Sequence, residues 1–175
     1  MAQHAILTAI GPDRPGLVDE VSEFIYQRGG NIEDSRMVNL RGQFAMMVLF
    51  GGDEKTVAQI RSEMWQLGQQ SGLQTDLRPA GPATAPMGDA LPYRLTATAI
   101  DQPGLVHRIS HLLRSASVNI ESMETRLTAA PYTGAPMFEM DLILSVPRQT
   151  SLAGLRQKLS GLCEELNIDF QLAAV

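Results

Sequence analysis

The hexapeptide DRPGLV, residues 13–18, follows a short apolar run and returns almost unchanged as DQPGLV at residues 101–106. The second copy lies 88 positions after the first (15 to 103), and the triplet NIE at residues 31–33 recurs at the same offset at residues 119–121. Two matches at one unchanged offset indicate an internal repeat. The chain of 175 residues therefore consists of two halves of similar length.

Both halves show the same alternation of strand and helix patterns. In the first half, apolar runs predict strands near 5–10, 31–40, 44–50 and 73–77, and helical spacing predicts helices through Leu17, Val18, Val21, Phe24 and Ile25 up to Gly29-Gly30, and through Val57, Ile60, Met64 and Leu67. The second half repeats this order, with strands near 93–100, 119–127, 138–144 and 168–172 and helices near 105–113 and 152–162. Each half thus reads β-α-β-β-α-β.

This order predicts the fold class. With right-handed crossovers, a β-α-β-β-α-β unit forms a four-stranded antiparallel sheet with two helices on one face, which is the ferredoxin-like arrangement. We expect an α+β protein with two such domains, residues 1–78 and 93–175. A segment rich in Pro, Ala and Gly, residues 79–92, is the predicted linker.

Composition limits the classes of function. A net charge of −5 and 5% aromatic residues provide no basic footprint, so we expect no direct nucleic-acid partner. No apolar run approaches the ~20 residues of a membrane span, so no membrane partner is expected. The single Cys163 excludes an intramolecular disulfide, and the N-terminal sequence lacks the features of a secretory leader. These features favour a cytoplasmic protein.

The third strands of the two halves differ in polarity. FAMMVLF, residues 44–50, is apolar on both faces, whereas FEMDLIL, residues 138–144, places Glu139 and Asp141 on one face. A two-layer fold leaves one sheet face uncovered, so the first half is expected to cover that face, and we predict a homo-oligomer. The alternative is that the linker covers the strand.

The first helices of the two halves differ in charge. Asp19, Glu20 and Glu23 of the first half correspond in position to His107, Arg108 and His111 of the second. One hypothesis is that the two helices have complementary fields. The alternative is that both are ordinary solvated surfaces, because exposed charge pairs contribute little.

The repeated turn is a candidate anion-binding site. Pro15 is expected at the first helical position, where its missing N–H costs nothing, and Gly16 leaves the neighbouring backbone N–H groups open to a carboxylate. If the loops converge, Asp13 and Asn31 can hold an ammonium group, which completes a site for a free amino acid. The alternative is structural: Asp13 caps the helix, worth ~1 kcal/mol, and Asn31 is a turn residue.

No catalytic or metal-ligating constellation is evident, and no cofactor is expected. His107 and His111 are four residues apart, but Arg108 stands where a zinc-protease motif has Glu. Cys163 lies in an apolar helix, which favours a packed thiol. An RNA-recognition motif shares the same element order, but Gln43 occupies its first aromatic position. The chain is therefore predicted not to be an enzyme.

The D-x-P-G-L turn that follows the first strand resembles that of the ACT domain, a small-molecule-sensing module. Two such units in tandem, with the hairpin APYTGAPMFEM at residues 130–140, are similar to the glycine cleavage system transcriptional repressor family. The resemblance implies a regulator that responds to a small amino acid such as glycine and acts through another protein, in that family a DNA-binding activator of the glycine cleavage genes. It implies ligand contacts at Asp13, Arg14, Pro15, Gly16, Leu17 and Asn31, and at Asp101, Pro103, Gly104, Leu105 and Asn119.

The second copy departs from this pattern. Gln102 replaces Arg14, and Ser117-Val118 replaces Gly29-Gly30, so the second turn is expected to bind differently or not at all. Serine-sensing domains of this kind place a His where this chain has Gly11 and Ala99, which disfavours serine. The protein partner that we expect is a transcription factor or a metabolic enzyme. The alternative function is a ligand-independent interaction module or the regulatory subunit of an enzyme of amino-acid metabolism.

Overall fold

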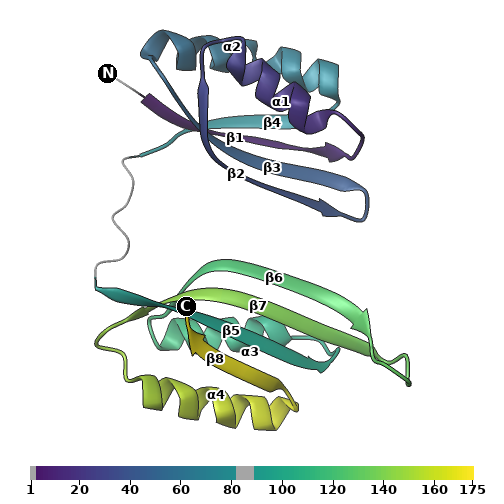
Figure 1. Ribbon diagram of the computed structural model, residues 1–175, viewed down its shortest axis with the longest axis vertical. Coiled ribbons are helices and arrows are strands. Elements are labelled where there is room, and N and C mark those ends of the chain that lie inside the picture. The colour runs from purple at the N-terminus through teal and green to yellow at the C-terminus, as the bar shows by residue number, and fades with distance from the viewer. Residues whose placement is uncertain (1–2, 82–88) are drawn as a thin grey trace. The chain divides into compact units, whose positions relative to one another are not determined.

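The computed structural model describes residues 3–81 and 89–175, and the chain divides into two compact units, Met1–Thr84 and Ala85–Val175 (Figure 1). The elements of the first unit are β1 (Gln3–Pro12), α1 (Leu17–Tyr26), β2 (Asn31–Leu40), β3 (Gln43–Gly52), α2 (Glu54–Ser71) and β4 (Gln74–Pro79). Those of the second are β5 (Ala90–Ile100), α3 (Leu105–Ser115), β6 (Asn119–Ala129), β7 (Pro136–Pro147), α4 (Leu152–Leu166) and β8 (Asp169–Ala174).

Each unit has the predicted ferredoxin-like fold. The sheets have the strand orders β2-β3-β1-β4 and β6-β7-β5-β8, and all of their neighbouring strands are antiparallel. In each unit the two helices cover one face of the sheet (Figure 1). The prediction of two β-α-β-β-α-β domains of the α+β class is therefore confirmed.

Each unit has its own hydrophobic core between the sheet and the helices. Alternate residues of the central strands point toward the helices, as the period of two requires. The first core contains Leu7, Val21, Ile25, Val48, Phe50, Ile60 and Leu67, and the second contains Leu95, Ile109, Leu113, Leu142, Leu144, Leu155 and Leu159. The helical spacing in the sequence identified most of the inward residues of the four helices. Val18 is an exception, because 44% of its surface is exposed.

The ordered strands extend to both ends of the predicted linker. β4 ends at Pro79 and β5 begins at Ala90, so both lie partly within the range 79–92. Residues 82–88 of that range lie outside the described residues.

Helix α1 begins two residues later than expected. Pro15 is not the first helical residue; Gly16 is the N-cap, with φ +95° and ψ −10° in the left-handed region, and the helix starts at Leu17. Gly104 occupies the same position before α3, with φ +94°. A residue with a side chain is strained in this conformation, which explains why each turn has glycine after its proline.

The turn after each first helix also keeps one backbone conformation despite the change of sequence. Gly29 has φ +80°, and its counterpart Ser117 has φ +57°, which is uncommon for a residue other than glycine. The next residue differs in size between the two units. In the first unit a Cβ on Gly30 would lie 2.7 Å from the side chain of Ile25, so there is no room for a larger residue. In the second unit the side chain of Val118 fits into the core. The departure in the second copy therefore alters packing and strain but retains the turn.

The uncovered faces of the two sheets differ as the sequence suggests. In the first sheet, Met47 is exposed over 53% of its surface and Ile10 over 51%. In the second sheet, the corresponding face has an ion pair between Arg94 and Asp141. The β6–β7 hairpin extends beyond the rest of the second sheet (Figure 1) and has the fully exposed Tyr132 at its tip.

Candidate functional site

The first repeated turn lines a pocket. Residues 13–19 form one side of it, and Ser22 of α1, Met37 of β2 and Phe44 of β3 form the rest, around a volume of about 680 Å³. Helix α1 has no side-chain cap, so the backbone N–H groups of its first turn have no side-chain acceptor. These amides and the positive end of the helix dipole are suited to a small carboxylate.

Arg14 at the edge of this pocket is engaged in an ion pair. Its guanidinium donates two hydrogen bonds to the carboxylate of Glu20, at 2.6 and 2.8 Å. These bonds hold the pKa of Glu20 below its usual value and raise that of Arg14. Because the Glu20 carboxylate already balances the charge of the Arg14 guanidinium, the backbone N–H groups are more available to an anion than Arg14 is.

Asp13 is bonded to the neighbouring hairpin and does not cap the helix. Its carboxylate accepts a hydrogen bond from the side-chain amide of Asn39, and its backbone N–H donates to the carbonyl oxygen of Gly42 at 2.8 Å. The backbone N–H of Gly42 in turn donates to Asn39 Oδ1 at 3.2 Å. The capping alternative for Asp13 is therefore wrong, and the carboxylate leaves the helix terminus open.

Asn31 does not lie in the turn pocket. It follows the C-terminal end of α1 and lines a second groove of about 450 Å³ between α1 and β2. Asp19 and Ser22 line both this groove and the turn pocket. Within one unit the structure therefore brings residues 13–17 together and places Asn31 in the adjoining groove.

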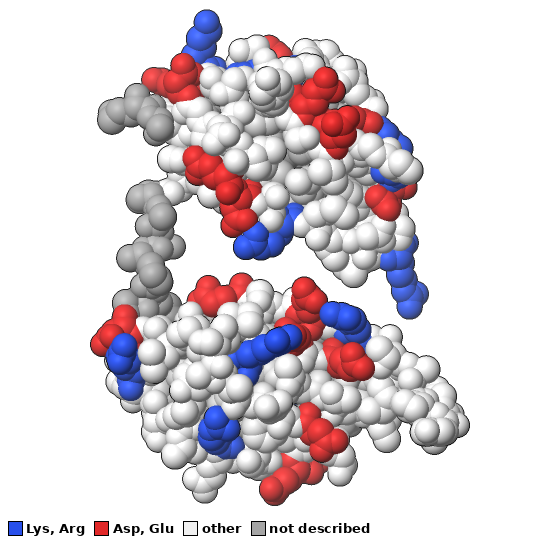
Figure 2. Space-filling view, viewed as in Figure 1, with Lys and Arg blue, Asp and Glu red and all other residues white. Residues whose placement is uncertain are grey.

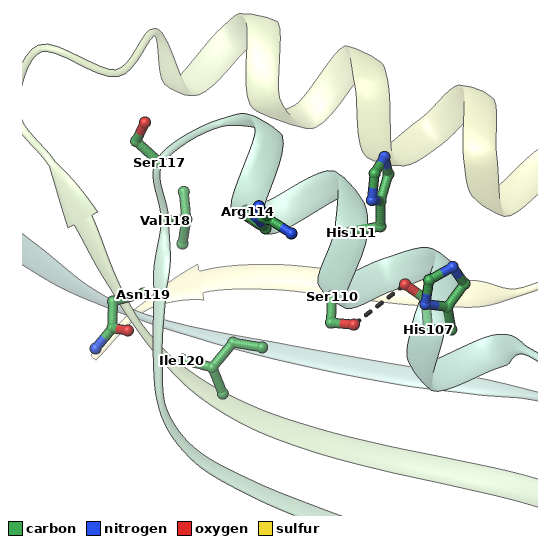
Figure 3. Close-up of a pocket in the computed structure, with 8 residues that line it drawn as sticks. All are labelled: His107, Ser110, His111, Arg114, Ser117, Val118, Asn119 and Ile120. Carbon is green, nitrogen blue, oxygen red and sulfur yellow. Dashed lines mark hydrogen bonds between the residues drawn. The ribbon is translucent and has the colours of Figure 1, made fainter.

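The second unit has a groove at the equivalent place. His107, Ser110, His111 and Arg114 project from α3, and residues 117–120 complete it across the following turn and the start of β6 (Figure 3). The Ser110 hydroxyl donates to the carbonyl oxygen of His107 at 3.1 Å, and the rings of His107 and His111 have centroids 6.0 Å apart. This groove corresponds, 88 positions on, to the groove that contains Asn31.

The two grooves carry opposite charge. The acidic Asp19 and Glu23 of the first correspond to His107 and His111 of the second, and Tyr26 corresponds to Arg114. Arg114 forms no ion pair with any residue that the structure describes. Part of the charge difference between the two helices thus lies in two matching grooves, of which the first contains two carboxylates and the second contains Arg114 beside two histidines.

The second repeated turn keeps the backbone of the first but has different contacts. Helix α3 also lacks a side-chain cap. The side-chain amide of Gln102 donates to the carbonyl oxygen of Leu166 at 2.9 Å, and Arg108, at the position of Glu20, pairs with Glu165 at 2.8 Å. Asn119 donates to Glu121 at 2.7 Å and lines the α3–β6 groove, which does not include Asp101, Pro103, Gly104 or Leu105.

The single cysteine lies in the core of the second unit. Cys163 is buried, and loss of solvent raises the pKa of its thiol to about 11, so it is almost entirely protonated near neutral pH. Among residues 3–81 and 89–175, no group of three or more acidic, His or Cys side chains is arranged to hold a metal ion. The same residues contain no helix with the length and apolar character needed to cross a membrane.

Charged side chains of both signs are interspersed on the visible face of each unit (Figure 2). The described part of the chain shows no continuous basic surface on that face.

Some residues of the site were not identified from the sequence. Asn39, Met37 and Phe44 approach the turn because the β2–β3 hairpin folds back beside it, and Ser22 reaches both cavities from α1. The signal for Ser22 was present, since it aligns with Ser110 at the repeat offset. The hairpin residues could be found only with the register of β3 against β1.

The chain is similar in sequence to ACT domains and to a transcriptional repressor. A family model described as the ACT domain matches residues 3–78. The glycine cleavage system transcriptional repressor of Escherichia coli is 28% identical over 172 residues, which cover 95% of this chain and 87% of the relative. A UPF0237 protein of Methanopyrus kandleri is 37% identical over 71 residues, covering 39% of this chain and 79% of the relative.

Among solved structures, an unknown protein from Galdieria sulphuraria is 28% identical and matches with a TM-score of 0.87. The match covers 100% of this chain and 99% of the other. Both halves therefore have counterparts in one experimentally determined chain.

Proposed function

The chain belongs to the ACT-domain family, and we propose on that premise that it is a regulatory protein that binds a small amino acid and acts by contact with another protein. The observation that carries the proposal is the pocket at the first repeated turn, whose uncapped helix terminus is open to a carboxylate. Similarity to the glycine cleavage system transcriptional repressor supports a role in gene regulation and glycine as the first ligand to test.

The pocket contains a partner for each end of a free amino acid. The carboxylate would accept hydrogen bonds from the backbone N–H groups after Gly16, and Asp13 or Asp19 would hold the ammonium group. Asn31 would contribute through the adjoining groove, which shares Asp19 with the pocket. We propose that the second turn, at Asp101, Pro103, Gly104 and Leu105 with Asn119, forms a related site with weaker or different selectivity.

The size of the ligand limits its affinity. At a ceiling of about 1.5 kcal/mol for each non-hydrogen atom, glycine could hardly bind more tightly than in the micromolar range. Such an affinity suits a sensor of a metabolite pool. Binding experiments must therefore extend to millimolar amino acid.

Isothermal titration calorimetry of the full chain against a panel of free amino acids tests the sensing function. We expect a saturable heat with glycine or another small amino acid. Gly16→Ala and Gly104→Ala form a matched pair, because both residues have nearly the same left-handed backbone and a new Cβ has room at both. Comparable stability with loss of binding in Gly16→Ala alone would assign the ligand to the first turn.

No heat with any amino acid at millimolar concentration would overturn ligand sensing. The interaction module that needs no ligand would then be the better function. Affinity purification from the native cell separates the proposed partners: a DNA-binding regulator supports transcriptional control, whereas an enzyme of amino-acid metabolism supports a regulatory subunit. The chain is proposed to be non-catalytic in either case.

A further inference from the structure

The uncovered face of the first sheet is apolar at its centre. Figure 1 shows both helices of this unit on the opposite face. Ile6, Met47 and Leu49 line a hollow of about 250 Å³ on this face together with residues 34–36. The other outward apolar side chains are Ile10, Val38 and Leu40, which are exposed over 51, 45 and 66% of their surface. Contiguous apolar surface of this kind is typical of an interaction site.

The second unit shows that the fold does not require an apolar surface here. The equivalent face of its sheet has Arg94 paired with Asp141, and the Thr128 hydroxyl bonded to Glu139 at 3.0 Å. These polar groups are satisfied within their own sheet. Ile100 of the second sheet is also exposed, but it lies at the end of its strand. Apolar residues at the centre of the uncovered face are therefore a property of the first unit.

Strand register places charges at four corners around Ile6, Met47 and Leu49, in an alternating order. Ile10 and Val38 lie in the next row of the sheet, beyond these corners. One row across the sheet runs Asp34, Leu49, Ile6, Arg78, and the next runs Arg36, Met47, Thr8, Asp76. The edge strand β2 thus has a negative charge beside a positive one, and β4 has the reverse. Within the sheet, Asp34 pairs with Arg36, and Asp76 with Arg78 at 2.8 Å.

We propose that this face binds the same face of a second copy of the chain, as a two-fold symmetric dimer of first units. A two-fold axis parallel to the strands exchanges the two edges and keeps the rows, so Asp34 would meet Arg78 of the second copy and Arg36 would meet Asp76. An axis perpendicular to the strands keeps the edges and exchanges the rows, so Asp34 would meet Arg36 of the second copy. In both orientations each corner charge meets an opposite charge, and Ile6, Met47 and Leu49 of the two copies meet between them.

Self-complementarity of this kind is what an isologous interface requires. Two sheets that pack face to face keep their strand directions within about 30° of each other, which maintains the alignment of the corners. The apolar centre supplies the stability of the contact, and the charges at its rim fix the register.

Sedimentation velocity of the full chain over the micromolar to sub-millimolar range tests the proposal. We expect a dimer whose dissociation constant rises by more than about a hundredfold in Met47→Glu, because two symmetric carboxylates would be buried without partners. Met47 points away from the core, so the variant should retain its circular dichroism spectrum. The control Ile100→Glu, on the uncovered face of the second sheet, should leave the dimer unchanged.

Charge reversal tests the geometry. Arg36→Asp should weaken the dimer by roughly tenfold, since it places like charges opposite each other. Restoration by the further change Asp76→Arg would indicate the parallel axis, and restoration by Asp34→Arg the perpendicular one. A monomeric wild-type chain, a dimer unaffected by Met47→Glu, or failure of both restorations would overturn the proposal.

Discussion

The two units of this protein share a backbone and differ in their surfaces. They have the same strand order, the same left-handed glycine before the first helix, and grooves at equivalent positions. In contrast, one groove contains acidic residues and the other basic ones, and the centre of one uncovered sheet face is apolar whereas the centre of the other has an ion pair. Local backbone geometry therefore sets the shape of a candidate site, whereas the side chains around the site determine the charge of the ligand that can bind there.

The largest effects are expected from substitutions in the two hydrophobic cores. Phe50 and Leu144 occupy matching positions, opposite Ile32 and Ile120 in their sheets, and both are fully buried. We expect Phe50→Ala to cost about 3–5 kcal/mol and Leu144→Ala about 2–5 kcal/mol. Hydrogen exchange should localise each loss of protection to the unit that contains the substitution. Equal loss in both units would show that the two cores are coupled.

The caps of the second helices differ in their response to pH. Asp53 accepts from the backbone N–H of Thr56 at 2.7 Å, and Ser151 accepts from that of Gly154 at 3.1 Å. Ser151→Ala should cost about 1 kcal/mol at all pH values, because the serine does not titrate.

The bond from Thr56 lowers the pKa of Asp53 below its ordinary value. Its stabilising effect is therefore fully present above the ordinary carboxyl pKa of about 4 and is lost as pH falls through the lower folded value. The destabilisation caused by Asp53→Ala should accordingly shrink in acid, as measured by denaturant unfolding between neutral pH and pH about 2. A pH-independent cost would contradict this assignment.

A smaller effect is expected at the turn after each first helix. Ser117 has the left-handed conformation that Gly29 has in the first unit. Ser117→Gly should relieve steric strain and stabilise the second unit by about 1 kcal/mol or less, since the added flexibility of the unfolded chain offsets part of the gain. Thermal unfolding measures the change. Gly29→Ser is the reciprocal variant and should destabilise the first unit by a similar amount.

The smallest effect is expected when the first turn is given the residue of the second. In Arg14→Gln the carboxylate of Glu20 loses both hydrogen bonds from the guanidinium. The pKa of Glu20 should rise toward its ordinary value, while the stability of this exposed region changes little. An NMR titration of the Glu20 carboxyl provides the measurement. An unchanged pKa would show that the ion pair does not persist in solution.

Much of the fold could be predicted because its signals are local. The helical spacing of Val21, Phe24 and Ile25, and the duplicated turn, depend only on near neighbours in the chain. The sequence pattern favours Pro15 as the first helical residue, because proline fits that position, whereas the structure has the left-handed Gly16 as the N-cap and Leu17 as the first residue. The local sequence alone does not distinguish a helix that starts at Pro15 from one that is capped by Gly16.

The candidate site was predictable only in part. The pocket residues 13–17 are contiguous, so one motif identifies them together. The bond between Asp13 and Asn39 depends on how a hairpin folds back against the turn, which no local pattern specifies. Separation of Asn31 from the pocket likewise follows from the length of α1, which places its two ends at different cavities. Amino-acid binding at these residues stays a prediction.

Both edge strands contain an irregularity at the same place. Pairing of β2 with β3 shifts between Ile32 and Asp34, and pairing of β6 with β7 shifts between Ile120 and Ser122, which leaves Glu33 and Glu121 as the extra residues. The two units therefore share this local irregularity as well as their strand order, although the residues that line their grooves differ in charge.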